Sequence, residues 1–474
     1  SLMVLGNCTS YAQLLARRGD LEADDVVSAF NLSIGVATLA TYFCSHCPFT
    51  LSSSDMTFLM YLNQLVVPIA AADLRDEAAI ATKWVALHVG SAILGGLITL
   101  LGMLRAAAAL SYLPYPVIAG FLAMVGAAIV HGAAEILMPE EGQTWAPLVL
   151  GTFLAAGTTL LKARGVPANL SAVASIVLSL LCFWGWVHIT GIPVASLREE
   201  GWLCPHRAER VAPLRTLEII DWRVVQWDFV LPDIKAGMLA LVACIGRALT
   251  LSSIEVAVGT RPYSVDDEMK STGLATMAAG AACGIAMNPA SSMSSLCKEG
   301  CEGDTRAALY TTLITSASFL AIWTLGIPLT NYLPKFLLGS LLMMMGFGML
   351  IDWVWNVRKR LEWHGNLIIY GMMAFSLKTS LIEGVMLGVG LAVVLANVRF
   401  ANLVVIKYHV SGVHFRSGQE YDAAQRAFLA KQGSRTQVVG ITGFLFEGVG
   451  ICLREYLRQL IRTIPDEAAV LVLD

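Results

Sequence analysis

Two short polar runs interrupt the long apolar stretches of this chain, and each carries paired serines. Residues 51–56 read LSSSDM, and residues 287–300 read MNPASSMSSLCKEG. Both runs are too polar to cross a bilayer, and both contain fewer charged residues than an ordinary surface loop. A helix that begins inside a membrane exposes free N–H groups and a positive dipole end, which favour an anion. The residues expected to open two such helices are Ser53, Ser54, Asp55, Ser291 and Ser292. The alternative is that these side chains only cap short helices.

Ionisable residues inside apolar stretches are costly and are functional candidates by default. Arg247 lies deep in LVACIGRALTLSSIEVA, and Glu255 follows two turns later. Arg247 can supply a fixed positive charge to a bound anion, or it can form a structural ion pair with Asp55 or Glu255. Asp55 can cap a helix, or it can bind a cation or a proton. Asp55 and Glu255 are therefore the candidates for binding a coupling ion.

Other reactive side chains give weaker patterns. His131 and Glu135, one helical turn apart, can form a proton relay or a packed polar pair. Cys44 and Cys47 form a CxxC, but nothing nearby completes a set of four zinc ligands. No nucleophile–base pair, metal cluster or nucleotide-binding motif is recognisable. We expect neither an enzyme nor a bound cofactor or metal.

The composition indicates the environment that must position these residues. Of the 474 residues, 56% are hydrophobic and 14% are charged, against about 25% charged in soluble domains. Apolar stretches of about 20 residues recur, which is the length that a bilayer requires of a helix. The sequence predicts an α-helical polytopic membrane protein. Its basic residues are scattered, so no nucleic acid is expected as a partner. The chain starts at Ser1 and stops after AAVLVLD, and we expect both ends to be cut from a longer protein.

The polar runs occupy matching places in two halves of the chain. A polar linker at about 196–227 separates halves at about 1–195 and 228–403. Matching interruptions of this kind indicate an inverted-repeat transporter with its site near the bilayer midplane. The spans expected in the second half are near 232–256, 272–286, 307–327, 333–355, 366–379 and 381–398. Residues 404–474 have strand-like and amphipathic helical patterns, which predict a partial α/β domain. Basic residues after the last spans place this domain in the cytoplasm.

Several longer motifs resemble the SulP family of anion permeases, which includes sulfate permeases, bicarbonate transporters, pendrin and prestin. They read SYLPYPVIAGFLAMVG, VDDEMKSTGLATMAAGAACG, SSLCKEGCEGDTRAAL and LPKFLLGSLLMMMGFGMLID. The resemblance implies fourteen transmembrane segments in a 7+7 inverted repeat, with core and gate domains of the uracil-permease type. It also implies a homodimer and a C-terminal STAS domain, of which residues 404–474 are the start. The substrate is then expected between the facing N-termini of the half-helices in segments three and ten.

The same resemblance assigns roles to single residues. In GNCTSYAQLL, Asn7 matches a glutamine and Tyr11 an aromatic residue, at two positions that usually face substrate. The alternative is that both only hydrogen-bond between helices. Many transporting relatives carry an acidic residue near the position of Arg247, where it binds sodium or couples to protons. Ser294 stands where some relatives carry an arginine. We therefore expect Arg247 to supply the positive charge in this chain.

The leading expectation is a secondary active transporter or exchanger of small inorganic or organic anions, such as sulfate, bicarbonate or chloride, working by an elevator-type movement. One alternative is a proton-coupled transporter of another solute, such as an amino acid. A second is a non-transporting membrane sensor or scaffold that acts through the STAS domain. Proton or sodium coupling stays open. The expected location is the bilayer of the plasma membrane or of a vacuolar or other endomembrane, with the protein as a homodimer.

Overall fold

The structure is a computed structural model, and it divides into two compact units that are considered separately. The membrane unit is Ser1–Gly388 and the C-terminal unit is Val389–Asp474. The residues that the structure describes are 2–72, 74–106, 114–140, 142–165, 168–204, 211–213, 215–258, 264–379, 381–401, 406–414, 419–433, 436–441, 447–463 and 470–473.

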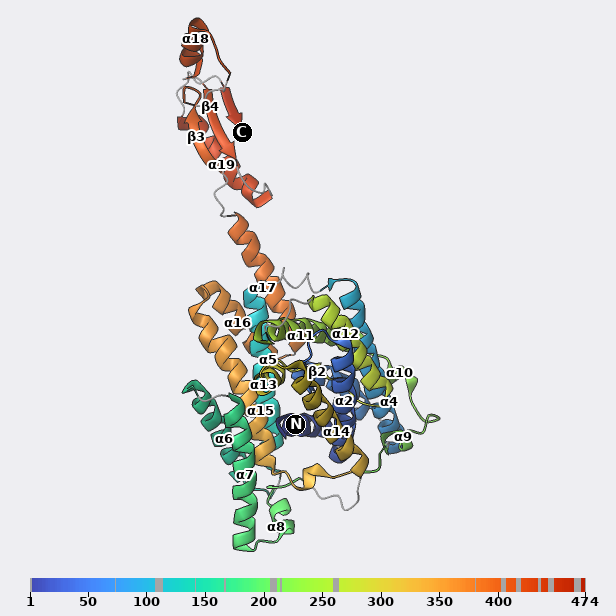
Figure 1. Ribbon diagram of the computed structural model, residues 1–474. Helices are drawn as coiled ribbons and strands as arrows, with labels where there is room; N and C mark the ends of the chain where they lie inside the picture. Colours follow the sequence, from blue (N-terminus) through green and yellow to red (C-terminus); the bar gives the residue numbers. More distant parts are fainter. Residues whose placement is uncertain are drawn as a thin grey trace. The chain divides into compact units, whose positions relative to one another are not determined.

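The membrane unit is built from helices (Figure 1). Its first half contains α1 (Leu2–Gly19), α2 (Ala23–Cys44), α3 (Met56–Ala70), α4 (Asp76–Met103), α5 (Tyr115–Leu137), α6 (Ala146–Ala163) and α7 (Ala168–Thr190). Short helices follow: α8 (Val194–Glu199), α9 (Arg215–Glu218) and α10 (Trp227–Val230). The second half contains α11 (Ile234–Val258), α12 (Val265–Ala281), α13 (Ser291–Gly300), α14 (Thr305–Leu325), α15 (Lys335–Leu350), α16 (Trp363–Ser376) and α17 (Leu381–Ala401), which runs past the unit boundary.

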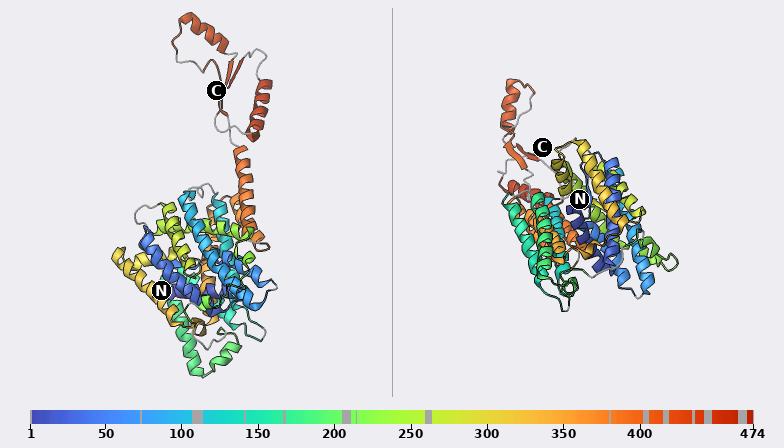
Figure 2. Two further views of the ribbon diagram at one scale, coloured as in Figure 1. Left: turned by 90° about the vertical axis from the view of Figure 1, so that its right-hand side faces the viewer. Right: turned by 60° about the horizontal axis from the view of Figure 1, so that its bottom comes forward.

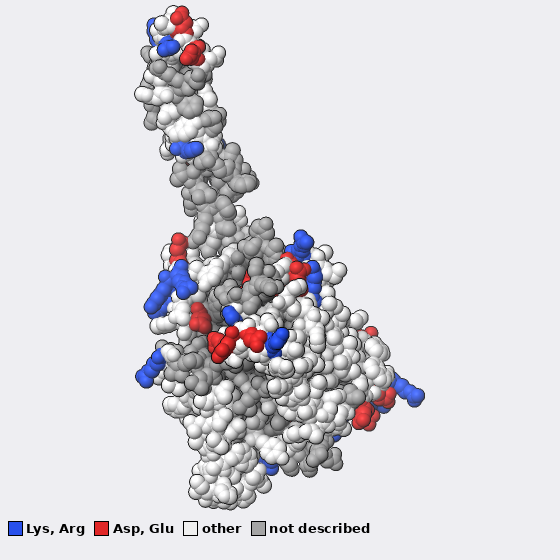
Figure 3. Space-filling model, viewed as in Figure 1, with Lys and Arg blue, Asp and Glu red and all other residues white. Residues whose placement is uncertain are grey.

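Length and hydropathy agree with a membrane location. Among the described residues, seven helices are long and apolar enough to cross a membrane. Shorter apolar helices, α3 among them, add to these. Large apolar side chains on α6 and α7 are exposed, such as Phe153 (73%) and Leu181 (67%). The face drawn in Figure 3 is mostly uncharged, with charged side chains gathered in a few groups. Such a surface suits hydrocarbon rather than water. The count of fourteen segments stays a prediction.

The two polar runs meet in a short antiparallel strand pair. Strand β1 (Ser52–Ser53) pairs with β2 (Asn288–Pro289), and Ser52 lies opposite Pro289. Helix α3 begins shortly after β1, and α13 begins shortly after β2. An antiparallel crossing therefore brings the starts of two short helices from opposite halves of the chain together.

The expected span at 272–286 is wrong in its bounds, because α12 covers Val265–Ala281. Three acidic residues stand in its first turn, where the helix dipole stabilises them. Glu268 is 1% exposed, and it accepts hydrogen bonds from the Ser45 hydroxyl (2.6 Å) and the His46 amide (2.7 Å). An acidic start that looks like a loop in sequence is thus the first turn of a helix, with Glu268 buried.

Helices α4 and α12 pack at very close range, which joins the two halves (Figure 2). A Cβ atom placed on Gly95 would lie 2.8 Å from the carbonyl oxygen of Gly273 and 2.8 Å from the Cα atom of Met277. A Cβ atom on Gly280 would lie 2.6 Å from the amide nitrogen of Ala92. Small residues at both surfaces let the two backbones touch, as is common between membrane helices.

We expect Gly95→Ala to lower the thermal stability of the purified protein, because α12 occupies the space that the added methyl group needs. Overpacking of this kind costs about 1–3 kcal/mol. Gly96→Ala is the matched control, since nothing lies within 4 Å of a Cβ atom there. The measurement is the melting temperature in detergent. Equal melting temperatures for the two variants would contradict the close contact.

The C-terminal unit has an α/β fold, as its sequence pattern predicts. Its three strands lie in the order β3–β4–β5, with β3 antiparallel and β5 parallel to β4. The elements are β3 (Ile406–Ser411), α18 (Ala423–Gly433), β4 (Thr436–Ile441), α19 (Glu447–Thr463) and β5 (Val470–Leu473). The identification of this unit as the start of a STAS domain stays a prediction.

Candidate functional site

The start of α3 is formed by an aspartate rather than by the serines. Asp55 is the N-cap residue, and its carboxylate accepts hydrogen bonds from the amide (2.8 Å) and the hydroxyl of Thr57. Of the three residues predicted to open this helix, Ser53 belongs to β1 and Ser54 precedes the cap, so Asp55 alone opens it, in the capping role considered for it. Ser53 and Ser54 are buried beside it, within 4.0 Å and 3.4 Å of the Cys8 sulfur atom.

Helix α1 covers this end of α3 with the two residues that the sequence selected. Asn7 is 2% exposed and Tyr11 is 1% exposed, and α1 packs against both α3 and β1. Cys8, next to Asn7, makes the contact with Ser54. Within the described residues, the amide oxygen of Asn7 has no hydrogen-bond partner. A buried acceptor without a donor is costly, and a ligand that carries an O–H or N–H group can supply one.

Helix α13 begins at Ser291, as the sequence predicts. The side chains of Ser291 and Ser292 lie outside the described residues. Ser294 is fully buried, and its hydroxyl donates to the carbonyl oxygen of Ala290 (2.8 Å) and accepts from the amide of Leu51 (3.4 Å). This serine therefore joins the first turn of α13 to the segment before β1.

Arg247 lies between the two short helices, completely buried at 1% exposure. Its Nη2 atom donates to the carbonyl oxygen of Met287 (2.6 Å) and to the hydroxyl of Thr276 (2.8 Å). The guanidinium carbon lies 5.0 Å from the centre of the Phe58 ring, in the first turn of α3. Met287 directly precedes β2, so Arg247 ties the crossing segment to α11 and α12 while it faces α3.

The ion pairs considered for Arg247 are not formed. Within the described part of the chain, neither Asp55 nor Glu255 lies within salt-bridge distance, and the Nε atom has no hydrogen-bond partner. Glu255 is half-buried near the end of α11. The guanidinium turns toward the Met287 carbonyl because that group, buried in the crossing, needs a donor. Its positive charge is thus not cancelled by a carboxylate in contact with it.

Most of the candidate site's described side chains are buried. Asn7, Tyr11, Ser53 and Arg247 are each no more than 2% exposed, and Ser54 is 9% exposed. Asp55, at the start of α3, is partly exposed. Access of a solute to the buried side chains requires movement of the surrounding helices.

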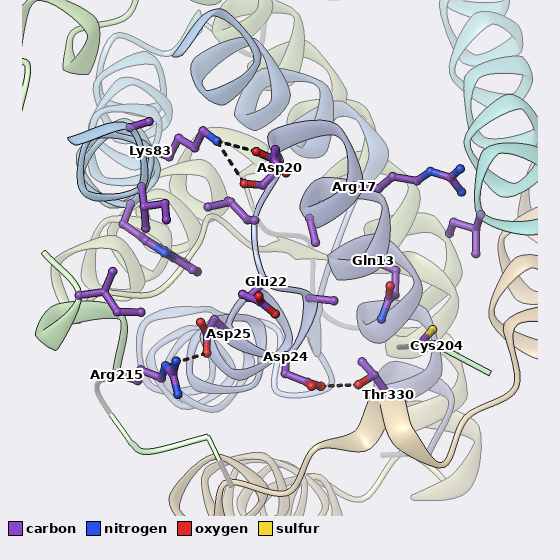
Figure 4. A pocket seen from close by; sticks show the side chains of 18 of the residues that line it. Gln13, Arg17, Asp20, Glu22, Asp24, Asp25, Lys83, Cys204, Arg215 and Thr330 are labelled. Atoms are coloured by element: carbon purple, nitrogen blue, oxygen red, sulfur yellow. Dashed lines mark hydrogen bonds and ion pairs between the residues drawn. The ribbon is translucent and has the colours of Figure 1, made fainter. Parts of the chain in front are cut away.

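A separate, open cavity of about 880 Å³ lies farther along α1 (Figure 4). It is polar and is crossed by ion pairs, Lys83 to Asp20 (3.7 Å) and Arg215 to Asp25 (3.5 Å). Carboxylates outnumber cations in its lining: Asp20, Glu22, Asp24, Asp25, Asp76 and Glu140 against Arg17, Lys83, Arg215 and Lys335. Burial raises the pKa of the Cys204 thiol in its wall to about 11, so this thiol is protonated at neutral pH. The sequence did not indicate this cavity, because its residues come from five separated segments, 13–25, 76–84, 136–140, 204–219 and 330–335.

His131 and Glu135 meet as expected, but with a partner that the sequence did not indicate. The Glu135 carboxylate accepts two hydrogen bonds from Arg18, at 2.8 Å and 2.9 Å, and lies 3.0 Å from the His131 Nδ1 atom. A bidentate arginine fixes the position and orientation of a carboxylate. This geometry favours the packed polar cluster over a proton relay, and it joins the end of α1 to α5.

Comparison with known proteins places these features in a wider group. A sequence model described as the "Sulfate permease family" matches residues 34–370. A relative is the vacuolar basic amino acid transporter VSB1 of Saccharomyces cerevisiae (strain ATCC 204508 / S288c), 22% identical over 413 residues, which are 82% of this chain. The chain spans about two fifths (39%) of the length of that relative.

Solved structures share the fold. The transmembrane domain of a cyanobacterium bicarbonate transporter, BicA, matches with a TM-score of 0.55 and 16% identity, over 82% of this chain and 95% of that one. The murine anion transporter Slc26a9, in the inward-facing state, matches with a TM-score of 0.64 and 15% identity, over 100% of this chain and 79% of that one. The architecture of this chain is therefore that of a helical, multi-pass integral membrane protein.

Proposed function

Because the chain belongs to the sulfate permease family, we propose that it is a secondary active transporter or exchanger of small anions, such as sulfate, bicarbonate or chloride. Family membership supports anion transport as the general activity. The choice of anion, the coupling ion and the elevator-type movement are the finer parts of the proposal.

The main support for this proposal is that helices α3 and α13 begin close to each other. Helices α3 and α13 both begin at the β1–β2 crossing, so their positive dipole ends lie close together, with the Asp55 carboxylate capping α3. The Arg247 guanidinium is buried beside the same crossing, and among the described residues no carboxylate lies within salt-bridge distance of it. Among mostly buried side chains these positive groups are screened less than in water, which favours an anion.

The substrate-binding residues follow from this arrangement. We assign the site to the α3 start, the α13 start, the facing side of α1 and Arg247, with Asp55 and Glu255 as candidates for proton or sodium coupling. The residues are Asn7, Tyr11, Ser53, Ser54, Asp55, Arg247, Ser291 and Ser292. The antiparallel crossing supports a 7+7 inverted repeat of fourteen segments, since it relates equivalent elements of the two halves. The enclosed site supports alternating access by movement of a core domain against a gate domain in a homodimer with a cytoplasmic STAS domain.

A second candidate function is transport of a basic amino acid. Two observations favour it: the excess of carboxylates around the 880 Å³ cavity, and the likeness to VSB1, whose name describes a vacuolar basic amino acid transporter. In this case Asp55 binds the substrate or a proton, and Arg247 has only a structural role. The vacuolar membrane is then the expected location.

The test is uptake into proteoliposomes that contain the purified full-length chain. The panel holds sulfate, bicarbonate, chloride, nitrate, a dicarboxylate, lysine and arginine, each with and without a pH gradient. We expect saturable uptake of at least one anion and none of lysine or arginine, with protein-free liposomes as the control. Uptake of basic amino acids alone would replace the anion proposal with the second candidate. No uptake of any solute by correctly folded protein would contradict both.

A further inference from the structure

A second large cavity, of about 1110 Å³, lies in the membrane unit between α3, the start of α11 and the turn from α16 to α17. It shares no residue with the anion site. Its lining combines a mostly apolar wall with the charged residues Arg18, Lys235 and Glu383. The mixture of long apolar side chains with a few charges differs from the polar lining of the cavity in Figure 4.

One buried polar group in this cavity has no partner. Asn63, on α3, is 6% exposed and lines the cavity. Within the described residues, neither its amide nitrogen nor its amide oxygen makes a hydrogen bond. A buried amide whose nitrogen and oxygen are both unpaired destabilises the folded protein, because both groups lose the hydrogen bonds that they make with water in the unfolded chain. A ligand in the cavity that offers a polar atom at this depth would remove that cost.

The charged group of the cavity that is available to a ligand is the Lys235 ammonium, near the start of α11. Lys235 is the second residue of α11, is exposed, and has no ion-pair or hydrogen-bond partner in the described part of the chain. Arg18 is already held by Glu135, and Glu383 is engaged in an interaction of its own. Two exposed, stacked tryptophans, Trp222 and Trp227, precede α11. Exposed tryptophans gather at the headgroup level of membranes, so Lys235 is placed at that level.

Apolar side chains that line the cavity are also exposed. Val67 is 43% exposed, Phe375 is 41% exposed and Met386 is 58% exposed. In a membrane protein, large exposed apolar side chains face lipid rather than water. The lining of the cavity therefore includes side chains that face hydrocarbon as well as a free ammonium group and an unpaired amide.

We propose that this cavity binds one membrane phospholipid. The lipid phosphate pairs with Lys235, as basic pockets between membrane helices pair with lipid headgroups. An ester carbonyl oxygen of the lipid accepts a hydrogen bond from the Asn63 amide nitrogen, and an acyl chain lies along Val67, Phe375 and Met386. The charged, polar and apolar parts of the lipid are thus each matched by a side chain of the same character in the cavity lining. The proposal does not depend on which solute the protein carries.

Native mass spectrometry of the purified full-length protein tests the proposal. The delipidated protein is titrated with phosphatidylglycerol, with diacylglycerol of the same acyl chains, and with inorganic phosphate. We expect one phosphatidylglycerol to be retained tightly, and neither of the other two probes. Lys235→Gln should weaken retention about tenfold, because it removes a charge-assisted bond to the phosphate. The matched control is Lys359→Gln, an exposed lysine outside the cavity.

Two further variants keep the test decisive. Met386→Trp fills the cavity from an exposed position, where misfolding is not expected, and should prevent retention. Asn63→Leu removes the unpaired amide and should also weaken it. Equal retention by Lys235→Gln, Met386→Trp and the Lys359→Gln control would overturn the proposal. A cavity that retains inorganic phosphate or diacylglycerol as tightly as phosphatidylglycerol would overturn it as well.

Discussion

Anion uptake is expected to fall about tenfold or more when Arg247 is replaced by methionine. The side chain donates to Met287 and Thr276 from a fully buried position between the two helix starts. A hydrogen bond from a charged group contributes about 1.5–3 kcal/mol, and each 1.4 kcal/mol corresponds to about a tenfold change in a rate or affinity. Methionine retains much of the volume but leaves the Met287 carbonyl with one donor, Thr276. Initial uptake rates in proteoliposomes, with the amount of folded protein measured by size-exclusion chromatography, give the result.

Two matched variants separate the charge of Arg247 from its hold on the crossing segment. Arg247→Lys keeps a positive charge but lacks the planar fork of donors. Thr276→Val keeps the arginine and removes one of its partners. If the charge attracts the anion, the Arg247→Lys variant should regain a large part of the uptake that the Arg247→Met variant loses. Its KM for the anion should then be lower than that of Arg247→Met. If Arg247 only positions β2, lysine and methionine should be equally impaired. Wild-type uptake by a folded Arg247→Met protein would remove Arg247 from the site.

The parts of this fold that sequence predicts are those set by local composition. Apolar stretches of membrane length indicate helices whatever their neighbours are, and a break such as Asn288–Pro289 ahead of a serine pair is enough to predict that α13 begins at Ser291. The same logic predicted the α/β character of the C-terminal unit from alternating and helical patterns. It misplaced the start of α12, because an acidic first turn looks like a loop until the hydrogen-bond partners of the buried Glu268, Ser45 and His46, are known.

The contacts that define the candidate site depend on residues far apart in the chain. Arg247 meets Met287 forty residues later, and Arg18 meets Glu135 after 117 residues. No local spacing encodes such pairs, so the sequence suggested Asp55 and Glu255 as partners of Arg247 on charge alone. The sequence indicated Ser53, Ser54 and Asp55 for the start of α3. Serine and aspartate are about equally good N-cap residues, so the sequence alone does not decide which of the three caps the helix. Family resemblance indicated where the site is, but not how its side chains bond.

Replacing Asp55 with asparagine is expected to separate the two candidate functions. Asparagine is as good an N-cap as aspartate, so it can keep the hydrogen bond from the Thr57 amide, at 2.8 Å in the native protein. It removes one negative charge from the start of α3. If the substrate is an anion, that change lowers repulsion, and uptake should be retained with an unchanged or lower KM. If the substrate is lysine or arginine, the loss of the carboxylate should raise KM steeply or abolish uptake.

Asp55→Ala supplies the control for folding. Alanine removes the cap as well as the charge, at a cost of about 1 kcal/mol, so its melting temperature should fall below that of Asp55→Asn. A pH gradient adds a further distinction. If Asp55 carries a coupling proton, Asp55→Asn should still exchange anions but no longer respond to the gradient, whereas a purely structural cap leaves the response intact. Loss of anion uptake in Asp55→Asn with no loss of stability would instead mean that the carboxylate takes part in binding. The positive ends of α3 and α13 would then not suffice to hold the substrate.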